Sequence, residues 1–126
     1  MITRQQKPVS LRKRTAFQAT AAHGKKWVTP AFILQTGPRP ETPSLPSQCG
    51  FGLTASKKMI GIAVLRNRAR RRLRALVAEV LPLYATDGHN FVLIARSPVL
   101  ERSYEDLKKD LRWALGKLGF QPVKTP

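Results

Sequence analysis

The apolar residues of this chain fall into short and long groups that predict a mixture of strands and helices. Two short groups, at residues 27–28 and 32–34, are separated by Pro30, and we interpret them as strands with an edge or a break between them. Residues 50–55 alternate, with Phe51, Leu53 and Ala55 on one side, which is typical of a half-buried strand. The continuous apolar run 91–95 follows a turn signal at Asp87-Gly88 and predicts a central strand.

Apolar residues at helical spacing, together with signals for helix starts and ends, predict three helices. From residue 62 to about 81 the apolar residues form one helical stripe, and Pro82 ends the helix nearby. A last helix starts at Ser103, which forms a capping box with Asp106, and runs to Gly119. A short first helix, from about Thr15, ends before Gly24.

The order is therefore helix, strands, helix, strand, helix, which predicts a single-domain α/β or α+β sandwich with helices covering a small mixed sheet. A length of 126 residues and a hydrophobic content of 42% allow one modest core. We place the domain at residues 10–120. We expect a flexible basic N-terminus at 1–9, a flexible tail at 121–126 and an exposed Pro-rich loop at 36–48.

Charge narrows the range of partners. The chain has 23 Lys plus Arg against 7 Asp plus Glu, a formal net charge of +16, so a polyanion is its natural partner. A membrane partner is not expected, because no stretch approaches the roughly 20 apolar residues that span a bilayer and the N-terminus lacks the apolar block of a secretory signal. The single Cys49 allows no internal disulfide, so the cytoplasm is the expected compartment.

The basic residues concentrate on the second predicted helix. Between residues 57 and 74 there are eight of them and no acidic residue: Lys57, Lys58, Arg66, Arg68, Arg70, Arg71, Arg72 and Arg74. Winding the segment into a helix places most of its arginines and Asn67 on the arc away from the apolar stripe, with Arg66 at the edge of the stripe. Like charges at i,i+4 cost a few tenths of a kcal/mol each, so a merely solvated face is a weak explanation. Guanidinium groups can grip phosphates bidentately and stack on bases, which favours folded RNA.

The segment Arg66-Asn67-Arg68, followed by the block 69–74, resembles the Arg-Asn-Arg signature of the bacterial ribonuclease P protein family. Residues 52–58 resemble the strand and Lys-Lys turn before that signature, 91–96 its following strand, and 11–24 its first helix. The resemblance covers roughly residues 11–118. It implies an αβββαβα domain of the ribosomal-protein type with a left-handed βαβ crossover through the basic helix.

The resemblance also implies a function: the protein subunit of the tRNA 5′-processing endoribonuclease ribonuclease P. Its partners would be the catalytic RNA and the 5′ leader of precursor tRNA, with no obligate protein partner. Matching positions imply RNA contacts by Lys57, Lys58, Arg66, Asn67, Arg68, Arg70, Arg71 and Arg74. They imply a leader-binding cleft with Phe17, Ile33 and Gln35.

Several of these roles have a structural alternative. Asn67 could equally brace the helix locally, and Phe17 could equally be a core aromatic. Relatives often carry aromatics at the positions of Ala21 and Gln35, so weaker leader stacking is expected here.

No catalytic residue is expected on the protein, because a protein nuclease usually clusters carboxylates around metal ions. The densest acidic group, Glu105, Asp106 and Asp110, lies in the first turns of the last helix, where helix-dipole stabilisation explains it. His23 and His89 are interpreted as surface residues near a helix end and a turn. We assign no metal ligand to the protein, and Mg²⁺ is expected in the holoenzyme, bound mainly by RNA.

Three other functions fit a small basic domain. A ribosomal or RNA-assembly protein is the main alternative. A DNA-binding regulator would require a dimer and duplex selectivity. A protein-only nuclease is disfavoured by the scarcity of carboxylates.

Overall fold

The computed structural model describes residues 9–11, 20, 24–38, 49–84 and 88–122. Its elements, in chain order, are β1 (Val9–Ser10), β2 (Lys25–Val28), β3 (Phe32–Pro38), β4 (Gly50–Thr54), α2 (Lys57–Ile60), α3 (Ala63–Val80), η1 (Leu81–Leu83), β5 (His89–Ala95), η2 (Ser97–Leu100) and α4 (Tyr104–Lys117). The predicted mixed α+β architecture is confirmed.

One mixed sheet forms the floor of the domain, with the strand order β1-β4-β5-β3-β2. The hairpin β2–β3 is antiparallel and β3 pairs antiparallel with β5. In contrast, β4 and β5 are parallel neighbours joined through α3. Phe91, Val92 and Leu93 are all buried although successive side chains point to opposite faces, and burial on both faces explains the continuous apolar run of β5. The two-residue β1 extends the sheet by pairing in parallel with β4.

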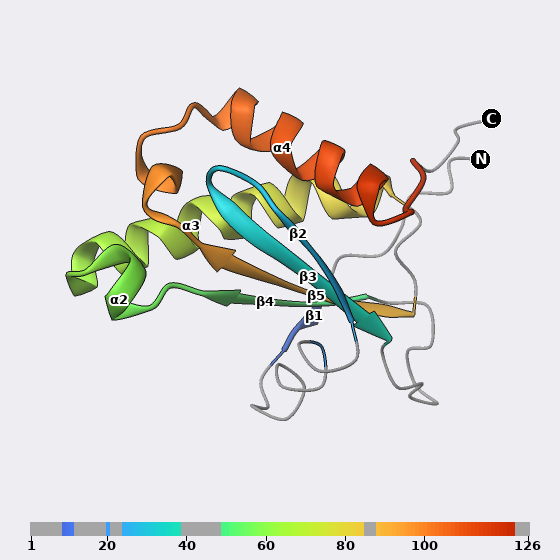
Figure 1. Cartoon of the computed structure of the whole chain (residues 1–126), viewed down its shortest axis with the longest axis horizontal. Coiled ribbons are helices and arrows are strands. Elements are labelled where there is room, and N and C mark those ends of the chain that lie inside the picture. Colours follow the sequence, from blue (N-terminus) through green and yellow to red (C-terminus); the bar gives the residue numbers. More distant parts are fainter. Residues whose placement is uncertain (1–8, 12–19, 21–23, 39–48, 85–87, 123–126) are drawn as a thin grey trace.

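Helices α3 and α4 lie side by side over one face of the sheet, α3 against β4 and β5, and α4 against β2 (Figure 1). The core between them includes Phe32, Leu34 and Leu93 from the predicted apolar strands and Leu73 and Leu111 from the predicted helices, all completely buried. The opposite face of β3 carries Ile33 and Gln35, each half-buried.

Helix boundaries follow local sequence signals. Ser103 caps α4 by accepting a hydrogen bond of 3.1 Å from the backbone N–H of Asp106, as the capping box predicted. Pro82 converts the end of α3 into the short helix η1, because a proline lacks the N–H that would continue the α-helical pattern. The predicted first helix lies almost entirely outside the described residues. Thr20, which is described, is buried.

Three predicted segment boundaries differ from the structure. Residues 36–38, placed in the Pro-rich loop, continue β3 and pair with β5 as far as Pro38 opposite His89. Strand β2 ends opposite Thr36, so the missing N–H of Pro38 costs no bond on that side. Val9, expected to be flexible, forms part of β1, and Pro122, placed in the tail, forms a bridge with Tyr84.

Candidate nucleic-acid interface

Helix α3 separates an apolar side from a cationic side. Its buried residues are Ala69, Leu73, Leu76, Val77 and Val80, the predicted stripe. Arg68, Arg71 and Arg74, spaced three residues apart, are exposed, so they form an outer row along the helix. The amphipathic pattern of α3 therefore fixes three guanidinium groups on its solvent side.

The first turns of α3 hold their polar side chains through local bonds. Arg66 Nη1 donates to the carbonyl of Gly61 at 3.0 Å, which folds this side chain back over the turn before the helix. Gly61 has φ +94°, a conformation that favours glycine at this turn. Arg70 Nη1 donates to Asn67 Oδ1 at 3.0 Å. Asn67 thus accepts a bond from a neighbouring side chain of the helix, and its own side chain is exposed.

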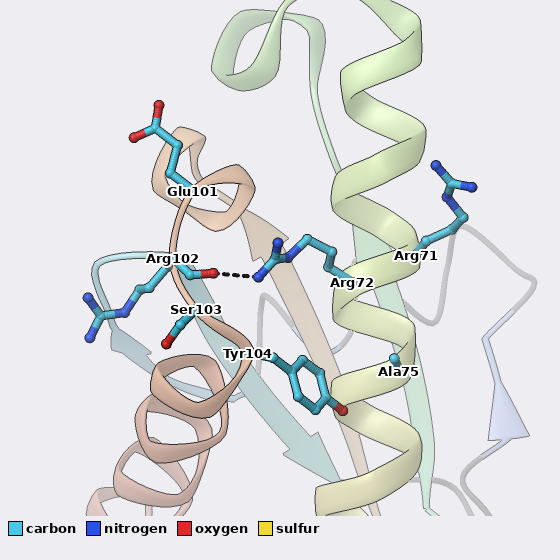
Figure 2. A pocket seen from close by; sticks show the side chains of 7 residues that line it. All are labelled: Arg71, Arg72, Ala75, Glu101, Arg102, Ser103 and Tyr104. Carbon is cyan, nitrogen blue, oxygen red and sulfur yellow. Dashed lines mark hydrogen bonds between the residues drawn. The ribbon is translucent and has the colours of Figure 1, made fainter.

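Arg72 was predicted to face outward with the other arginines of the helix, and this prediction is wrong. Its guanidinium reaches the turn that precedes α4, where Nη2 donates to the carbonyl of Arg102, and the side chain is half-buried (Figure 2). Its Nε is buried and has no hydrogen-bond partner in the part of the chain that the structure describes. Sequence periodicity placed Arg72 with the outward arginines, because it locates the Cα of a residue and not the carbonyl that a long side chain can reach.

An open groove of about 520 Å³ runs between α3 and the start of α4. Arg72, Ala75 and Tyr104 form its walls, whereas the guanidinium group of Arg71 is directed away from it to the other side of α3 (Figure 2). The outer row of α3 and the groove therefore adjoin at Arg71, which lines the groove while its guanidinium group points to the other side of the helix.

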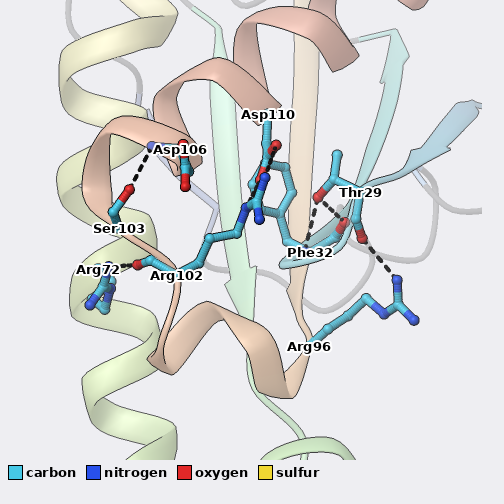
Figure 3. Close-up of polar contacts among 8 residues, drawn as sticks. All are labelled: Thr29, Phe32, Arg72, Arg96, Arg102, Ser103, Asp106 and Asp110. Atoms are coloured by element: carbon cyan, nitrogen blue, oxygen red, sulfur yellow. Dashed lines mark hydrogen bonds and ion pairs between the residues drawn. The ribbon is translucent and has the colours of Figure 1, made fainter.

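Among the described residues, no arginine of α3 is part of an ion pair. Arg102 pairs with Asp110, Nε to Oδ2 at 2.6 Å and Nη2 to Oδ1 at 3.0 Å (Figure 3). Lys108 pairs with Glu79 at 3.1 Å and with Glu105 at 3.0 Å. The three carboxylates that form ion pairs within this part of the chain, Asp110, Glu79 and Glu105, thus pair with Arg102 and Lys108, and the arginines of α3 have no ionic partner there.

The pairs along α4 shift protonation equilibria in the expected directions. The hydrogen bond to Asp110 raises the pKa of Arg102, and hydrogen bonds to Glu105 and Glu79 raise the pKa of Lys108. Burial raises the pKa of Tyr104. These groups keep their ordinary charge states at neutral pH, so they stabilise the seam between the helices rather than supply an acid or a base.

The remaining predicted RNA residues lie at the entry to α3. Lys57 and Lys58 are exposed on α2, a single helical turn that packs against α3. The structure therefore brings the two lysines and the basic helix into one region.

The predicted leader residues are described only in part. Ile33 and Gln35 lie on the face of β3 opposite the helices, where Ile33 pairs with Ile94 and Gln35 with Val92 of β5. Phe17 and Ala21 lie outside the described residues. Thr20 lies against this face at its far end, because a Cβ added to Gly37 would approach the Cα of Thr20 to 3.2 Å.

The structure changes the interpretation of two titratable residues, Asp110 and His89. Asp110, explained by the helix dipole from sequence, is buried and paired with Arg102. His89, placed in a turn, begins β5 and packs its ring edge against Phe120 at a centroid distance of 4.9 Å. The described residues contain no group of three or more His, Cys, Asp or Glu side chains able to hold a metal ion. None of the described helices is long and apolar enough to cross a membrane.

Comparison with known proteins decides the family. The family model described as Ribonuclease P matches residues 6–119. The chain belongs to the ribonuclease P protein family. The ribonuclease P protein component of Paramagnetospirillum magneticum is 45% identical over 86% of this chain and 81% of its own. That of Bacillus cereus is 35% identical over 90% of this chain and 94% of its own.

Solved structures of the family share the fold. The RNase P protein of Staphylococcus aureus superposes with a TM-score of 0.69 at 22% identity, covering 90% of this chain and 97% of its own. The protein from Thermotoga maritima gives a TM-score of 0.67 at 19% identity, covering 86% and 94%. The resemblance drawn from the Arg-Asn-Arg segment is confirmed, as is the function of a protein component of the tRNA 5′-processing ribonucleoprotein. Family membership sets aside the ribosomal, DNA-binding and protein-only nuclease alternatives.

Proposed function

We propose that this chain binds the catalytic RNA of ribonuclease P through the outer row of α3, together with Lys57 and Lys58 of α2. The observation that carries the proposal is the uncompensated charge of α3: Arg68, Arg71 and Arg74 are exposed on one side without a carboxylate partner in the described chain. Phosphates would occupy the field between these guanidinium groups and release their counterions. The bond from Arg70 to Asn67 orients a fourth arginine beside the row.

In this proposal the RNA performs the hydrolysis and the protein positions the RNA. Asp110, Glu79 and Glu105 are engaged with Arg102 and Lys108, and the described residues hold no group of three or more carboxylate, His or Cys side chains able to bind a metal ion. Mg²⁺ then acts on the RNA side of the complex, and no step of the reaction is assigned to a side chain of this chain. The cytoplasm is the expected compartment.

We further infer that the face of β3 opposite the helices contacts the 5′ leader of precursor tRNA through Ile33 and Gln35. Ile33 and the neighbouring Ile94 offer half-buried aliphatic surface, and Gln35 offers an amide that can bond a base edge. Since Gln35 replaces an aromatic that relatives often carry, the leader would gain hydrogen bonding there and lose stacking. Phe17, the predicted stacking residue, lies outside the described residues.

Reconstitution tests the proposal. The chain is added to a ribonuclease P RNA at low Mg²⁺, and cleavage of precursor tRNA is followed. We expect the RNA with protein to cleave, and the protein alone to be inactive. Failure of the protein to stimulate cleavage, in a preparation shown to be folded by circular dichroism, would reject the assignment.

The leader contact is tested separately by Phe17→Ala and Gln35→Ala. Binding of precursor and mature tRNA to the reconstituted complex is measured side by side. We expect each substitution to weaken precursor binding selectively, because mature tRNA has no leader. Equal weakening for both RNAs would show that the face does not bind the leader.

A further inference from the structure

Both tryptophans of the chain meet on the side of the domain formed by α4 and β2, away from the outer row of α3. Trp27 of β2 and Trp113 of α4 are in edge-to-face contact, with ring centroids 5.6 Å apart and an interplanar angle of 87°. Strand β2 is the edge of the sheet opposite β1, and α4 packs against it (Figure 1). The pair therefore marks a surface distinct from the proposed interface on α3.

The pair is more exposed than core packing requires. Trp113 has an exposed fraction of 54%, although large aromatic side chains are normally well covered in a folded domain. Gly116, one turn further along α4, faces open space, so no side chain of that residue screens the ring. Trp27 is half-buried against the core and supports Trp113 from below. The arrangement holds an exposed indole in a fixed orientation.

Lys117 lies beside this pair, and further cations are exposed on the two elements that carry it. Lys117 Nζ lies 5.9 Å from the centroid of Trp113 and 6.0 Å from that of Trp27. Lys25 of β2, and Lys109 and Arg112 of α4, are exposed. We call this set the α4–β2 edge: Lys25, Trp27, Lys109, Arg112, Trp113 and Lys117.

Two of the three acidic side chains of α4 are engaged by cations outside the α4–β2 edge. The carboxylates of α4 all lie in its first half, where Asp110 is paired with Arg102 and Glu105 with Lys108. The second half of α4 carries only cations among its charged residues. An exposed aromatic ring with a cation beside it and further exposed cations on the same elements is a composition that binds single-stranded nucleic acid, where a base stacks on the ring and the flanking phosphates contact the cations.

We propose that the α4–β2 edge is a second RNA-binding surface, which stacks an unpaired base on Trp113 and contacts the flanking phosphates through Lys117, Lys109 and Lys25. The proposal rests on the proposed function in taking RNA as the polyanion. A protein partner is disfavoured by charge, because every charged residue of this surface is a cation, as a polyanion requires. The unpaired strand belongs either to the catalytic RNA or to precursor tRNA.

The chain supplies its own probe for this surface. Because Trp27 and Trp113 are its two tryptophans, intrinsic indole fluorescence reports on the α4–β2 edge alone. The full-length protein is titrated with an oligouridylate of roughly eight nucleotides, within the usual site size of single-strand binders. We expect saturable quenching that weakens with salt, with a slope lowered by about 0.7 in Lys117→Ala.

Substitutions separate stacking from folding. Trp113→Ala should weaken oligonucleotide binding roughly tenfold, followed by anisotropy of a labelled oligouridylate, and Trp113→Phe should restore most of the affinity. Val28→Ala is the matched control, since Val28 is 52% exposed on the same strand but faces away from Trp27. Absence of quenching at low salt, or equal loss in Trp113→Ala and Val28→Ala, overturns the proposal.

The reconstituted complex identifies the source of the strand. Loss of affinity for the catalytic RNA in Trp113→Ala assigns the edge to that RNA, and loss only for precursor tRNA assigns it to the substrate. If neither affinity changes, or if Trp113→Ala instead abolishes self-association of the free protein in sedimentation, the edge does not bind RNA. A combined Arg68→Ala and Arg71→Ala variant should keep the oligouridylate quenching, so failure of the α3 proposal is distinguishable from failure of this one.

Discussion

Removing two arginines from the outer row of α3 should change how RNA binding depends on salt, and not only how strong it is. The variant to be tested carries both Arg68→Ala and Arg71→Ala. Both side chains are exposed and neither is part of an ion pair or hydrogen bond found among the described residues, so the substitutions should leave the fold intact. Alanine also has the best helix propensity, which protects α3 itself.

The magnitude follows from counterion release. Each phosphate contact contributes about 0.7 to 0.9 to the slope of log affinity against log salt, so the double variant should lose about 1.4 to 1.8 from that slope. Between about 50 and 200 mM salt, its affinity would therefore fall about 7- to 12-fold less than that of the unsubstituted protein. The two proteins should differ most at low salt.

Affinity of the protein for ribonuclease P RNA, measured by filter binding over a KCl series, checks this prediction. The matched control is Arg96→Ala with Lys108→Ala, which removes the same charge from side chains that already have partners in the chain: the carbonyl of Thr29 for Arg96, and Glu79 and Glu105 for Lys108. We expect the control to keep a steeper slope than the α3 variant. If both slopes fall equally, net charge explains the effect and the outer row is not the contact surface.

Other predictions concern the scaffold that holds these surfaces. Leu73→Ala should lower the free energy of unfolding by about 2 to 5 kcal/mol in urea titrations, because it empties a completely buried position under α3. Ser103→Ala should cost about 1 kcal/mol in the same assay by removing the cap of α4, and Ser103→Asp should restore most of it. Hydrogen bonds to Glu105 and Glu79 raise the pKa of Lys108, so its charged form stabilises the fold fully below about 10.5, the pKa of an unfolded lysine. This stabilisation is lost as the pH rises through the folded pKa. In urea titrations, the free energy of unfolding of Lys108→Gln should therefore decrease less at alkaline pH than that of the unsubstituted protein. The free protein, with a net charge of +16, should unfold at a higher temperature as KCl is raised from a low level, and a flat response in scanning calorimetry would show that self-repulsion is not significant.

The fold could be predicted largely because its elements have clear periodicities. The stripe of α3, the central run of β5 and the Ser103 cap each depend on residues close together in sequence. Strand β1 was missed because two residues have no measurable period, and its pairing with β4 is set by position in space. The continuation of β3 through Pro38 was missed for a related reason: whether a proline interrupts a sheet depends on which side has a neighbouring strand.

The candidate site could be predicted less completely, because long side chains form hydrogen bonds with groups that are distant in the sequence. Arg68 and Arg71 are exposed as expected, whereas Arg72 reaches the carbonyl of Arg102, 30 residues further along the chain. The contact between Trp27 and Trp113 joins an edge strand to the last helix, so no local pattern could reveal it. Helical spacing alone would have identified Lys109, Trp113 and Lys117 as one row, and that signal was available.

The scarcity of carboxylates explains how this chain can be both folded and strongly basic. With 7 acidic residues for 23 Lys and Arg, most cations cannot find an ionic partner. Within the described ranges, three arginines are held by backbone carbonyls: Arg66 by Gly61, Arg72 by Arg102 and Arg96 by Thr29. A carbonyl fixes a guanidinium group in place without cancelling its charge. Arginines that build the fold therefore also add to the field that attracts RNA, and replacing them by lysine would keep the charge while losing the planar geometry that reaches a carbonyl and a phosphate together.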